Sequence, residues 1–365
     1  MKIAFVSAAR SIHTVKWVNA LARNGHEVRL YSLPDHQNTL KNIDERVTVV
    51  YLAKAGTAGY FLNARQLRHE IEKFEPDIIN SHYASGYGTL TRLARVHPIL
   101  LSVWGSDVYD FPQKSPVHKW MVEQNIKKAD GLASTSYVMA DQVRRVFGYQ
   151  KEIYITPFGV DCSLFSPGET EKGKKEFCVG TVKALEDKYG INYLIRAFGI
   201  FLKSIQGEAD ARLVIYGAGS KKDELQHLID TLGLTERARL CGAVPNTEVP
   251  KAIRQIDVFC LPSILNSESF GVSAVEAMAC QVPVIASDVD GFTETVEDGV
   301  TGYLVPKQDA QAIADRLLEL YRDPEKRRSF GRAGRQRVLR LYDIEKNVLE
   351  LEEFYRQTMK NAKRK

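Results

Sequence analysis

Short runs of Val, Ile, Leu and Phe recur along the chain and alternate with longer segments whose apolar residues are three or four positions apart. The short runs predict buried strands, and the longer segments predict amphipathic helices. This alternation is typical of parallel sheets that carry helices on both faces. The predicted strands of the first half are 2–7, 27–32, 47–51, 77–80, 99–103, 130–134 and 152–155. Those of the second half are 176–182, 212–216, 238–241, 257–261 and 284–286, with 303–305 as a short addition.

Because the alternation occurs twice, the expected fold is α/β, with two doubly wound Rossmann-like domains. The polar stretch "SPGETEKGKKE" at 166–176 is the predicted linker. The predicted domains are therefore 1–165 and 166–342, followed by a helix at 343–365. Doubly wound sheets bind ligands beyond the carboxyl ends of their strands. With two such domains, the cleft between them is the expected binding site.

The composition is that of an ordinary soluble globular protein, with 44% hydrophobic and 26% charged residues. The net charge of +5 resides in residues 1–165, which favours an anionic partner, although ordinary surface charge explains it equally well. The five cysteines form no C-x-x-C pair, as expected for free thiols in the cytoplasm. No apolar run approaches the roughly 18 residues of a membrane span, and "MKIAFVSAAR" reads as a strand instead of a signal peptide.

Several partial motifs argue against other kinds of site. "GETEKGKK" at 168–175 nearly spells a P-loop, but Lys175 replaces the hydroxyl that binds magnesium, and the segment precedes a strand. Asp288 and Asp290 form a D-x-D pair in a predicted turn with no further metal ligand nearby. The chain contains no H-E-x-x-H or G-x-S-x-G motif, which disfavours metalloproteases and α/β-hydrolases.

Two glutamates, Glu268 and Glu276, lie eight residues apart in "LNSESFGVSAVEAMA", between two predicted strands. A helix that starts near Gly271 would direct unpaired amides and a partial positive charge at a ligand, and such an end favours phosphate. The glutamates are then explained as hydrogen-bond acceptors for hydroxyl groups on either side of that phosphate, as in a nucleotide sugar. The alternative makes Glu268 a capping residue and Glu276 a solvated helix residue.

Two lysines strengthen the nucleotide-sugar hypothesis. Lys183 and Lys188 lie in a predicted loop directly after the first strand of the second domain. Lysines in that position neutralise a diphosphate and stabilise its departure.

Five segments, in order, resemble the retaining glycosyltransferases of the GT-B fold, sequence family four. They are "ITPFGVDCSLFSP", "VKALEDKYGINYLIRAF", "LVIYGAGS", "ESFGVSAVE" followed by "AMACQVPVIAS", and "DGVTGYLVP". In the first domain the resemblance is weaker and continues through "GHEVRLYS", "DIINSH" and "WGSD". It implies a GT-B fold with an interdomain cleft and a last helix that packs back on the first domain.

By position, the resemblance assigns the donor-sugar hydroxyls to Glu268 and the ribose to Glu276. It assigns the diphosphate to Lys188, with Lys183 in place of the family's usual arginine, and it implies a reaction without a metal ion. The remaining positions assigned to the nucleotide sugar are Phe270, Gly271, Val272, Gly217 and Val244.

Two departures from the family pattern lie in the first domain. Where the family commonly has H-G-x-D, this chain has Trp104-Gly105-Ser106-Asp107. Asp107 keeps the position to which the family pattern assigns a catalytic role. Trp104 replaces the histidine and supplies only an N–H donor. The family's glycine-rich loop after the first strand is here "SAARSIHT". Arg10 and His13 are the predicted replacement hydrogen-bond donors, and both are assigned to binding of the nucleotide sugar. For His13 and His82, structural hydrogen bonds are the alternative explanation.

The expected acceptor is a sugar or lipid-linked glycan bound mainly by the first domain. The stretch "YVMADQVRRVF" at 137–147 is predicted either to rest on an anionic membrane surface or to pack on its own core. The expected location is the cytoplasm, with peripheral attachment to the inner face of the cell membrane as an accompanying hypothesis. Two alternatives are a nucleotide-sugar epimerase of the same architecture and a non-catalytic glycan-binding scaffold. The paired lysines argue against the second alternative, because a binding protein does not need to stabilise a leaving group.

Overall fold

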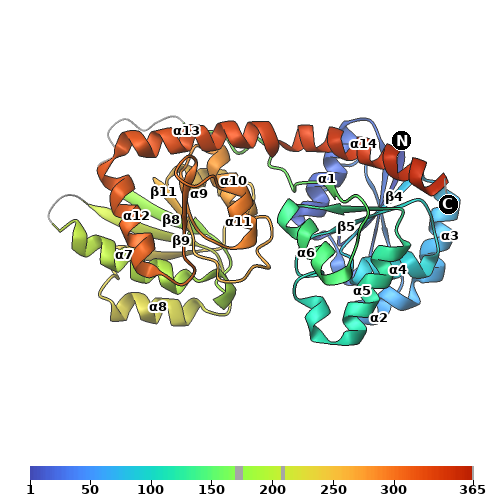
Figure 1. Ribbon diagram of the computed structural model, residues 1–365, viewed down its shortest axis with the longest axis horizontal. Coiled ribbons are helices and arrows are strands. Elements are labelled where there is room, and N and C mark those ends of the chain that lie inside the picture. The colour runs from blue at the N-terminus through green and yellow to red at the C-terminus, as the bar shows by residue number, and fades with distance from the viewer. Residues whose placement is uncertain (169–175, 207–209, 364–365) are drawn as a thin grey trace. The chain divides into compact units, whose positions relative to one another are not determined.

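The computed structural model describes residues 1–168, 176–206 and 210–363, and the chain forms two compact units (Figure 1). The first unit comprises Met1–Phe158 together with Ile344–Lys365, and the second comprises Gly159–Asp343. The first unit thus ends at Phe158, earlier than the predicted boundary at 165/166. The predicted linker at 166–176 begins inside the second unit, and its residues 169–175, which include most of the P-loop-like segment, lie outside the described residues.

The first unit contains a seven-stranded sheet in the order β3-β2-β1-β4-β5-β6-β7, and every pair of neighbouring strands is parallel. The strands are β1 (Lys2–Val6), β2 (Glu27–Ser32), β3 (Thr48–Tyr51), β4 (Ile78–His82), β5 (Ile99–Val103), β6 (Gly131–Ser134) and β7 (Tyr154–Ile155). The helices are α1 (Ile12–Arg23), η1 (Pro34–His36), α2 (Gly56–Leu62), α3 (Ala64–Phe74), α4 (Gly86–Ala94), η2 (Phe111–Lys114), α5 (Pro116–Lys128), α6 (Tyr137–Phe147) and α14 (Ile344–Lys363).

The second unit contains a six-stranded parallel sheet in the order β10-β9-β8-β11-β12-β13. The strands are β8 (Phe177–Val182), β9 (Ala211–Tyr216), β10 (Ala238–Gly242), β11 (Val258–Leu261), β12 (Val284–Ser287) and β13 (Gly302–Val305). The helices are η3 (Asp187–Tyr189), α7 (Ile191–Ser204), α8 (Lys222–Thr231), α9 (Val249–Arg254), α10 (Val272–Ala279), α11 (Asp290–Thr295), α12 (Ala310–Arg322) and α13 (Pro324–Leu341).

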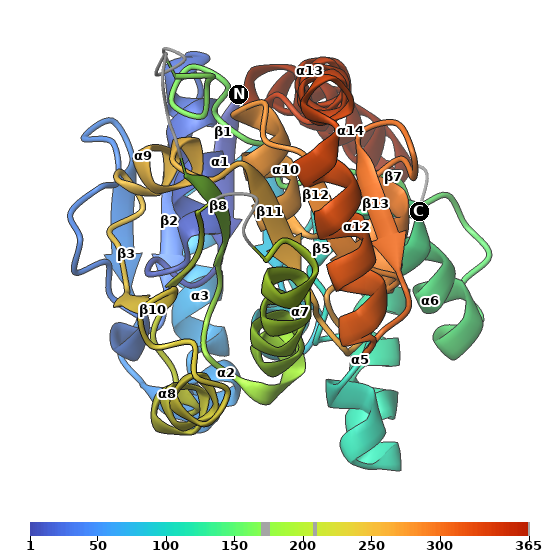
Figure 2. The same ribbon diagram turned by 90° about the vertical axis from the view of Figure 1, so that its left-hand side faces the viewer.

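Each strand predicted from the apolar runs corresponds to a strand of the structure, including the short one at 303–305. The fold is therefore the expected pair of doubly wound α/β sheets. The strands of both sheets have near-continuous apolar sequences. Helices cover each sheet on both faces, so neither face of a central strand contacts water. In the second unit, α7 and α12 lie side by side over one face of the sheet (Figure 2).

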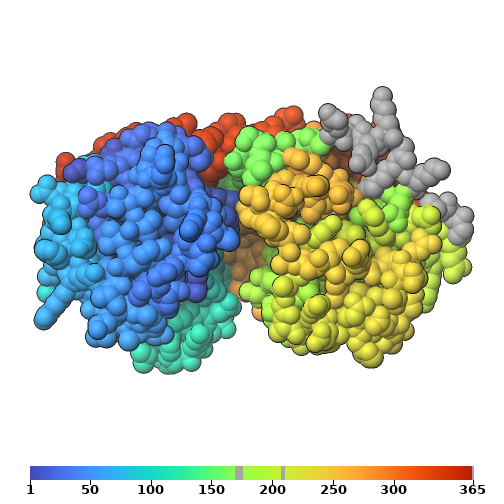
Figure 3. Space-filling view, turned by 180° about the vertical axis from the view of Figure 1, so that it is seen from behind, coloured from blue at the N-terminus to red at the C-terminus, as the bar shows by residue number. Residues whose placement is uncertain are grey.

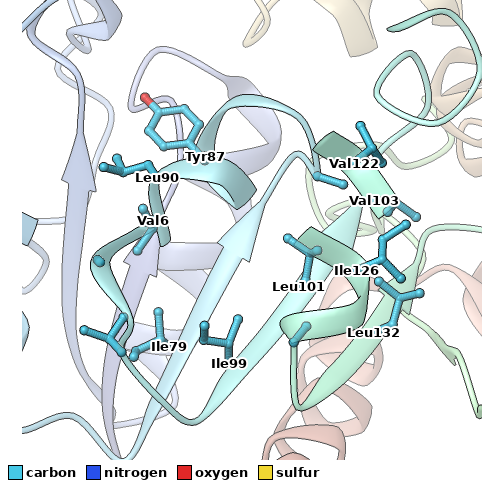
Figure 4. Packing of buried hydrophobic residues seen from close by; sticks show 14 of the residues in the cluster. Val6, Ile79, Tyr87, Leu90, Ile99, Leu101, Val103, Val122, Ile126 and Leu132 are labelled. Carbon is cyan, nitrogen blue, oxygen red and sulfur yellow. The ribbon is translucent and has the colours of Figure 1, made fainter. Parts of the chain in front are cut away.

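The core of the first unit lies on both sides of its sheet. On one side, side chains of β4, β5 and β6 pack against α4 and α5, among them Ile79, Leu101, Leu90 and Ile126 (Figure 4). On the other side, α14 contributes Val348, Leu351 and Tyr355 to a cluster with α1 and β1. The last helix of the chain is therefore part of the first unit.

The stretch 137–147 forms α6, and its apolar side chains face inward. Met139, Ala140, Val143 and Phe147 are all buried in the core of the first unit. Of the two predicted roles for this helix, the structure favours packing on its own core over resting on a membrane. Within residues 1–168, 176–206 and 210–363, no helix has the length and apolar character needed to cross a bilayer.

Candidate functional site

The candidate site lies at the carboxyl edge of the second sheet, where β8 is flanked by β9 and β11. The chain leaves β8 towards β9 and leaves β11 towards β12, so the strand order reverses between β8 and β11. Such a reversal separates the two loops and creates the usual ligand position of a doubly wound sheet. The loop after β8 carries both predicted lysines, and the loop after β11 carries Glu268 and leads into α10.

The two lysines converge on the ring of Tyr189. The ammonium of Lys183 lies 4.6 Å from the ring centroid, and that of Lys188 lies 4.9 Å from it. Lys183 also forms an ion pair with Glu268, with 2.7 Å between Nζ and Oε2, and both side chains are nearly buried at 12% and 14% exposure. Lys188 is exposed. The structure therefore brings together three of the four predicted catalytic residues.

The helix that follows Glu268 begins as predicted. α10 starts at Val272, and its N-cap residue Gly271 has a φ angle of 79°, a conformation that glycine adopts at little cost. As a glycine, Gly271 has no side chain with which to cap the helix. The Ala274 amide donates to the carbonyl oxygen of Gly271 at 2.9 Å. The amides of Val272 and Ser273 are therefore the ones offered to an anion, and the helix dipole favours negative charge there. Val272 and Ser273, in its first turn, are half-buried.

Glu276 and Phe270 are both buried within the second unit. Glu276 is 8% exposed although it carries a carboxylate, which is unusual for this residue type on a helix. Its burial excludes the alternative in which Glu276 is a solvated helix residue. Phe270 is 2% exposed, and its ring packs edge-on against Tyr342.

Two family models match this chain. "Glycosyl transferases group 1" matches residues 165–337, and "Glycosyl transferase 4-like" matches residues 2–136. The chain belongs to the family-four glycosyltransferases. Its two parallel sheets form the GT-B fold of that family.

Known glycosyltransferases resemble this chain over almost its whole length. N-acetyl-alpha-D-glucosaminyl L-malate synthase from Bacillus anthracis is 25% identical, covering 94% of this chain and 92% of the relative. D-inositol 3-phosphate glycosyltransferase from Corynebacterium glutamicum is 28% identical, covering 89% and 86%. The solved structure of HepE from Anabaena, in complex with UDP, has a TM-score of 0.83 at 19% identity and covers 98% of this chain and 100% of its own.

Three glycines set the spacing of the loops in this glycosyltransferase. A Cβ atom on Gly217 would lie 1.9 Å from the carbonyl oxygen of Lys183, and one on Gly190 would lie 2.1 Å from that of Pro262. A Cβ atom on Gly291 would lie 2.4 Å from the carbonyl oxygen of Glu268. The same carbonyl oxygen accepts a hydrogen bond from the Gly291 amide at 3.0 Å. Backbone atoms meet at all three positions, so no side chain can be accommodated without moving a loop.

Replacing Gly291 with alanine should therefore destabilise the protein by about 1–3 kcal/mol, the usual cost of forcing a group into a packed region. The displaced loop carries Glu268, so sugar transfer should fall as well. Gly199→Ala is the matched control: this glycine lies within α7, and its new Cβ would come no closer than 3.6 Å to another group. Because alanine favours a helix, that variant should be more stable by up to about 1 kcal/mol. Urea unfolding measures both changes; equal stability of the two variants would contradict the steric argument.

The other predicted residues of the second unit lie at the same sheet edge. Gly217 follows β9, and its amide donates to the carbonyl oxygen of Gly242 at 2.8 Å. Val244 is half-buried in the loop after β10, the edge strand. Val244 therefore lies two strands away from the lysine loop, which follows β8.

Asp107 lies in the first unit and is fully buried. Its Oδ2 accepts from the Ala84 amide at 2.7 Å, and its Oδ1 accepts from the amides of Trp104 and Gly105 at 3.1 and 2.9 Å. Burial raises the pKa of Asp107, and these backbone donors oppose that rise. The carboxylate thus fixes the turn that holds Trp104. The catalytic role assigned to Asp107 from the family pattern stays a prediction.

Arg10 and His13 lie after β1, at the carboxyl edge of the first sheet. The guanidinium of Arg10 donates to the carbonyl oxygen of Asp35 at 3.2 Å. His13 stacks on Phe158, with 3.9 Å between ring centroids, and meets Trp104 edge-on. Arg10 and His13 therefore belong to a different unit from the lysine pair.

His82, at the end of β4, has the structural hydrogen bond that the alternative explanation required. Its Nε2 lies 2.9 Å from Oδ1 of Asn80, which also accepts from the Tyr355 hydroxyl at 2.7 Å. Because that oxygen is an acceptor, Nε2 carries the proton. Burial lowers the pKa of His82 well below 6.5, so the ring is neutral at physiological pH.

Sequence reasoning missed Tyr189, Gly190 and Gly291. The signals were present: an aromatic residue beside Lys188, a glycine immediately before a helix, and a glycine directly after the D-x-D pair, which was placed in a predicted turn. The Asp288–Asp290 pair lies next to this glycine, with Asp290 as the first residue of α11. In the part of the chain that the structure describes, no three His, Cys, Asp or Glu side chains gather as a metal site would require.

Proposed function

We propose that this protein is a retaining, metal-independent hexosyltransferase that moves a hexose from a nucleoside-diphosphate sugar to an acceptor hydroxyl, in the synthesis of a cell-surface polysaccharide or glycolipid. The observation that carries the proposal is the convergence of Lys183, Lys188 and Glu268 beside the uncapped N-terminus of α10. Two cations and a helix N-terminus suit a diphosphate, and a carboxylate beside them suits the hydroxyls of a sugar.

A nucleotide sugar as donor also agrees with what is known of similar proteins. HepE, which shares the fold at 19% identity, has been solved in complex with UDP and with UDP-glucose. In the proposed arrangement Glu276 accepts hydrogen bonds from the ribose, and Glu268 accepts them from the hexose. The backbones of Phe270, Gly271 and Val272 line the sugar, and Gly217 and Val244 border the nucleotide.

The chemical step requires little from the protein beyond placement and charge. The bond between the anomeric carbon and the phosphate oxygen breaks, and the diphosphate takes the electron pair. Lys188 and Lys183 stabilise the negative charge that develops on it. The acceptor oxygen attacks from the side that the diphosphate leaves, and a phosphate oxygen takes the acceptor proton, so the anomeric configuration is retained.

The proposed acceptor carries a negative charge and is bound mainly by the first unit. Residues 1–165 account for the net charge of +5. The names of two similar enzymes also contain anionic compounds, L-malate and inositol 3-phosphate. Within the first unit, Arg10, His13 and the half-buried Trp104 at the sheet edge are the groups we propose for acceptor recognition.

The donor can be identified by a thermal-shift screen of nucleoside diphosphates and nucleotide sugars. A nucleotide at 100 times its Kd should stabilise the folded protein by about 2.7 kcal/mol. Hexose transfer should then be measured with anionic acceptors, and the anomeric configuration of the product should be read by NMR. An inverted product would refute retention, and release of free or epimerised sugar without an acceptor would favour an epimerase.

Because the proposed charge stabilisation comes from lysines, turnover should survive an excess of EDTA. The same assay with added manganese is the control. Complete loss of turnover in EDTA that manganese restores would refute the metal-independent mechanism.

A further inference from the structure

We propose that one face of α5 docks the first unit on an anionic lipid bilayer. This "α5 surface" consists of Val117, Trp120, Lys127 and Lys128. The inference rests on the proposed function only for its purpose, since a docked enzyme gains access to a lipid-linked acceptor.

The α5 surface exposes apolar side chains on a helix that already has a buried face. Val122 and Ile126 point into the core of the first unit (Figure 4). On the opposite side, Val117 is 69% exposed and Trp120 is 55% exposed. These two residues are three positions apart and therefore share one side of the helix. Core packing accounts for the inner face of α5 and leaves the outer face unexplained.

Positive charge continues along the same side. Lys127 lies seven residues after Trp120, and Lys128 lies eleven residues after Val117, spacings that return to one helix face. Both lysines are exposed. The segment Phe111–Lys128 contains four lysines and one glutamate, Glu123, which pairs with Lys127 at 2.5 Å. The α5 surface thus combines a tryptophan with surplus positive charge.

This combination fits the boundary between water and an anionic bilayer. Tryptophan is enriched at that boundary because its ring is apolar and its N–H needs a polar partner. Lysines keep their ammonium groups among anionic headgroups while their stems lie on apolar surface. A second copy of this chain is a poorer occupant, because pairing the α5 surface with itself would bring like charges together.

The position of α5 leaves the surface open to a flat partner. α5 packs against α4 on its inner side and protrudes at the lower end of the first unit in Figures 1 and 2. In the space-filling view of Figure 3, the teal segment that contains it forms the lower edge of that unit. By contrast, α6 offers only Tyr137 as an exposed large apolar residue, since its other apolar side chains are in the core.

The test is flotation of the full-length protein with vesicles of phosphatidylcholine, with or without phosphatidylglycerol, in the absence of any nucleotide sugar. The protein should float only with the anionic vesicles, and less so at high salt, because salt screens exposed charges. Trp120→Ala should weaken binding roughly tenfold through lost apolar burial. Lys127→Gln and Lys128→Gln should each weaken it about fivefold.

Tyr137→Ala is the matched control, because it removes an exposed aromatic ring from α6 and should leave flotation unchanged. Trp120 fluorescence offers a second readout, since Trp17 is buried and Trp104 is half-buried. Emission should shift to the blue on anionic vesicles, and Trp120→Phe should abolish the shift.

Equal flotation with both kinds of vesicle, or unchanged flotation of Trp120→Ala, would overturn the proposal. So would a Trp120-dependent dimer in light scattering without lipid binding, which would assign the α5 surface to a second copy. If the protein floats but transfers no hexose, the proposed function fails while the docking surface stands.

Discussion

Replacing Lys188 with alanine should lower the kcat of hexose transfer by about 100- to 1,000-fold, the usual cost of removing one preorganised group that stabilises developing charge. Negative charge on the diphosphate grows as the glycosidic bond breaks, so the loss should appear in kcat more than in KM. Lys188 is exposed and contacts Tyr189 through its ammonium, so its removal leaves the core intact. Steady-state kinetics with the identified donor measures the effect.

Lys222→Ala provides the control for charge alone. Lys222 is also an exposed lysine of the second unit, but it begins α8 and lies outside the loop that follows β8. Its replacement should change kcat little. A Lys188→Ala enzyme that is folded by circular dichroism and transfers hexose at the normal rate would place the leaving-group site elsewhere.

The two glutamates should respond in opposite ways to replacement by alanine. Glu276→Ala should weaken binding of the free nucleoside diphosphate by about 10- to 100-fold, the range expected when a hydrogen bond to a charged group is lost. Glu268→Ala should leave that affinity unchanged or strengthen it, because the ion pair that occupies Lys183 disappears. The same Glu268 variant should impair hexose transfer, since its proposed partner is the sugar. Calorimetry and kinetics on the same preparations distinguish these effects.

Glu236→Ala removes an exposed carboxylate from the second unit and is the control for a general change of charge. Loss of nucleoside diphosphate binding in Glu268→Ala, together with normal binding in Glu276→Ala, would reverse the two assignments. A Lys183→Ala/Glu268→Ala double variant adds a check on coupling. Residues in direct contact give non-additive effects, so the double variant should differ from the sum of the single ones.

Much of the fold follows from local patterns along the chain. A short apolar run between turn residues favours a buried strand, so the sequence predicts a strand at 257–261. The structure has β11 at Val258–Leu261. The unit boundary was predicted less well. A polar stretch indicates exposure to water, whereas the change of unit depends on which core receives the next apolar side chains. Val160 and Phe165 are buried in the second unit, which moves the boundary to Phe158.

The candidate site was predictable as far as its residue types and loops. The start of α10 at Val272 agrees with the glycine signal that predicted it. The ion pair of Lys183 with Glu268 could not be predicted, because only the pairing of β8 with β11 brings these distant positions together. The environment of Asp107 was equally hidden, since one of its donors, the Ala84 amide, belongs to a different loop.

The close backbone contacts at Gly190, Gly217 and Gly291 have a consequence for protein engineering. They make the distances between the site loops a property of the main chain, so side-chain exchange elsewhere in these loops leaves the loop framework in place. A library intended to change donor preference should keep the three glycines and vary Val272 and Val244, whose side chains are half-buried in these loops. Random mutagenesis of the whole region would instead include changes at these glycines that displace the loops, and such variants would underestimate how readily the specificity can change.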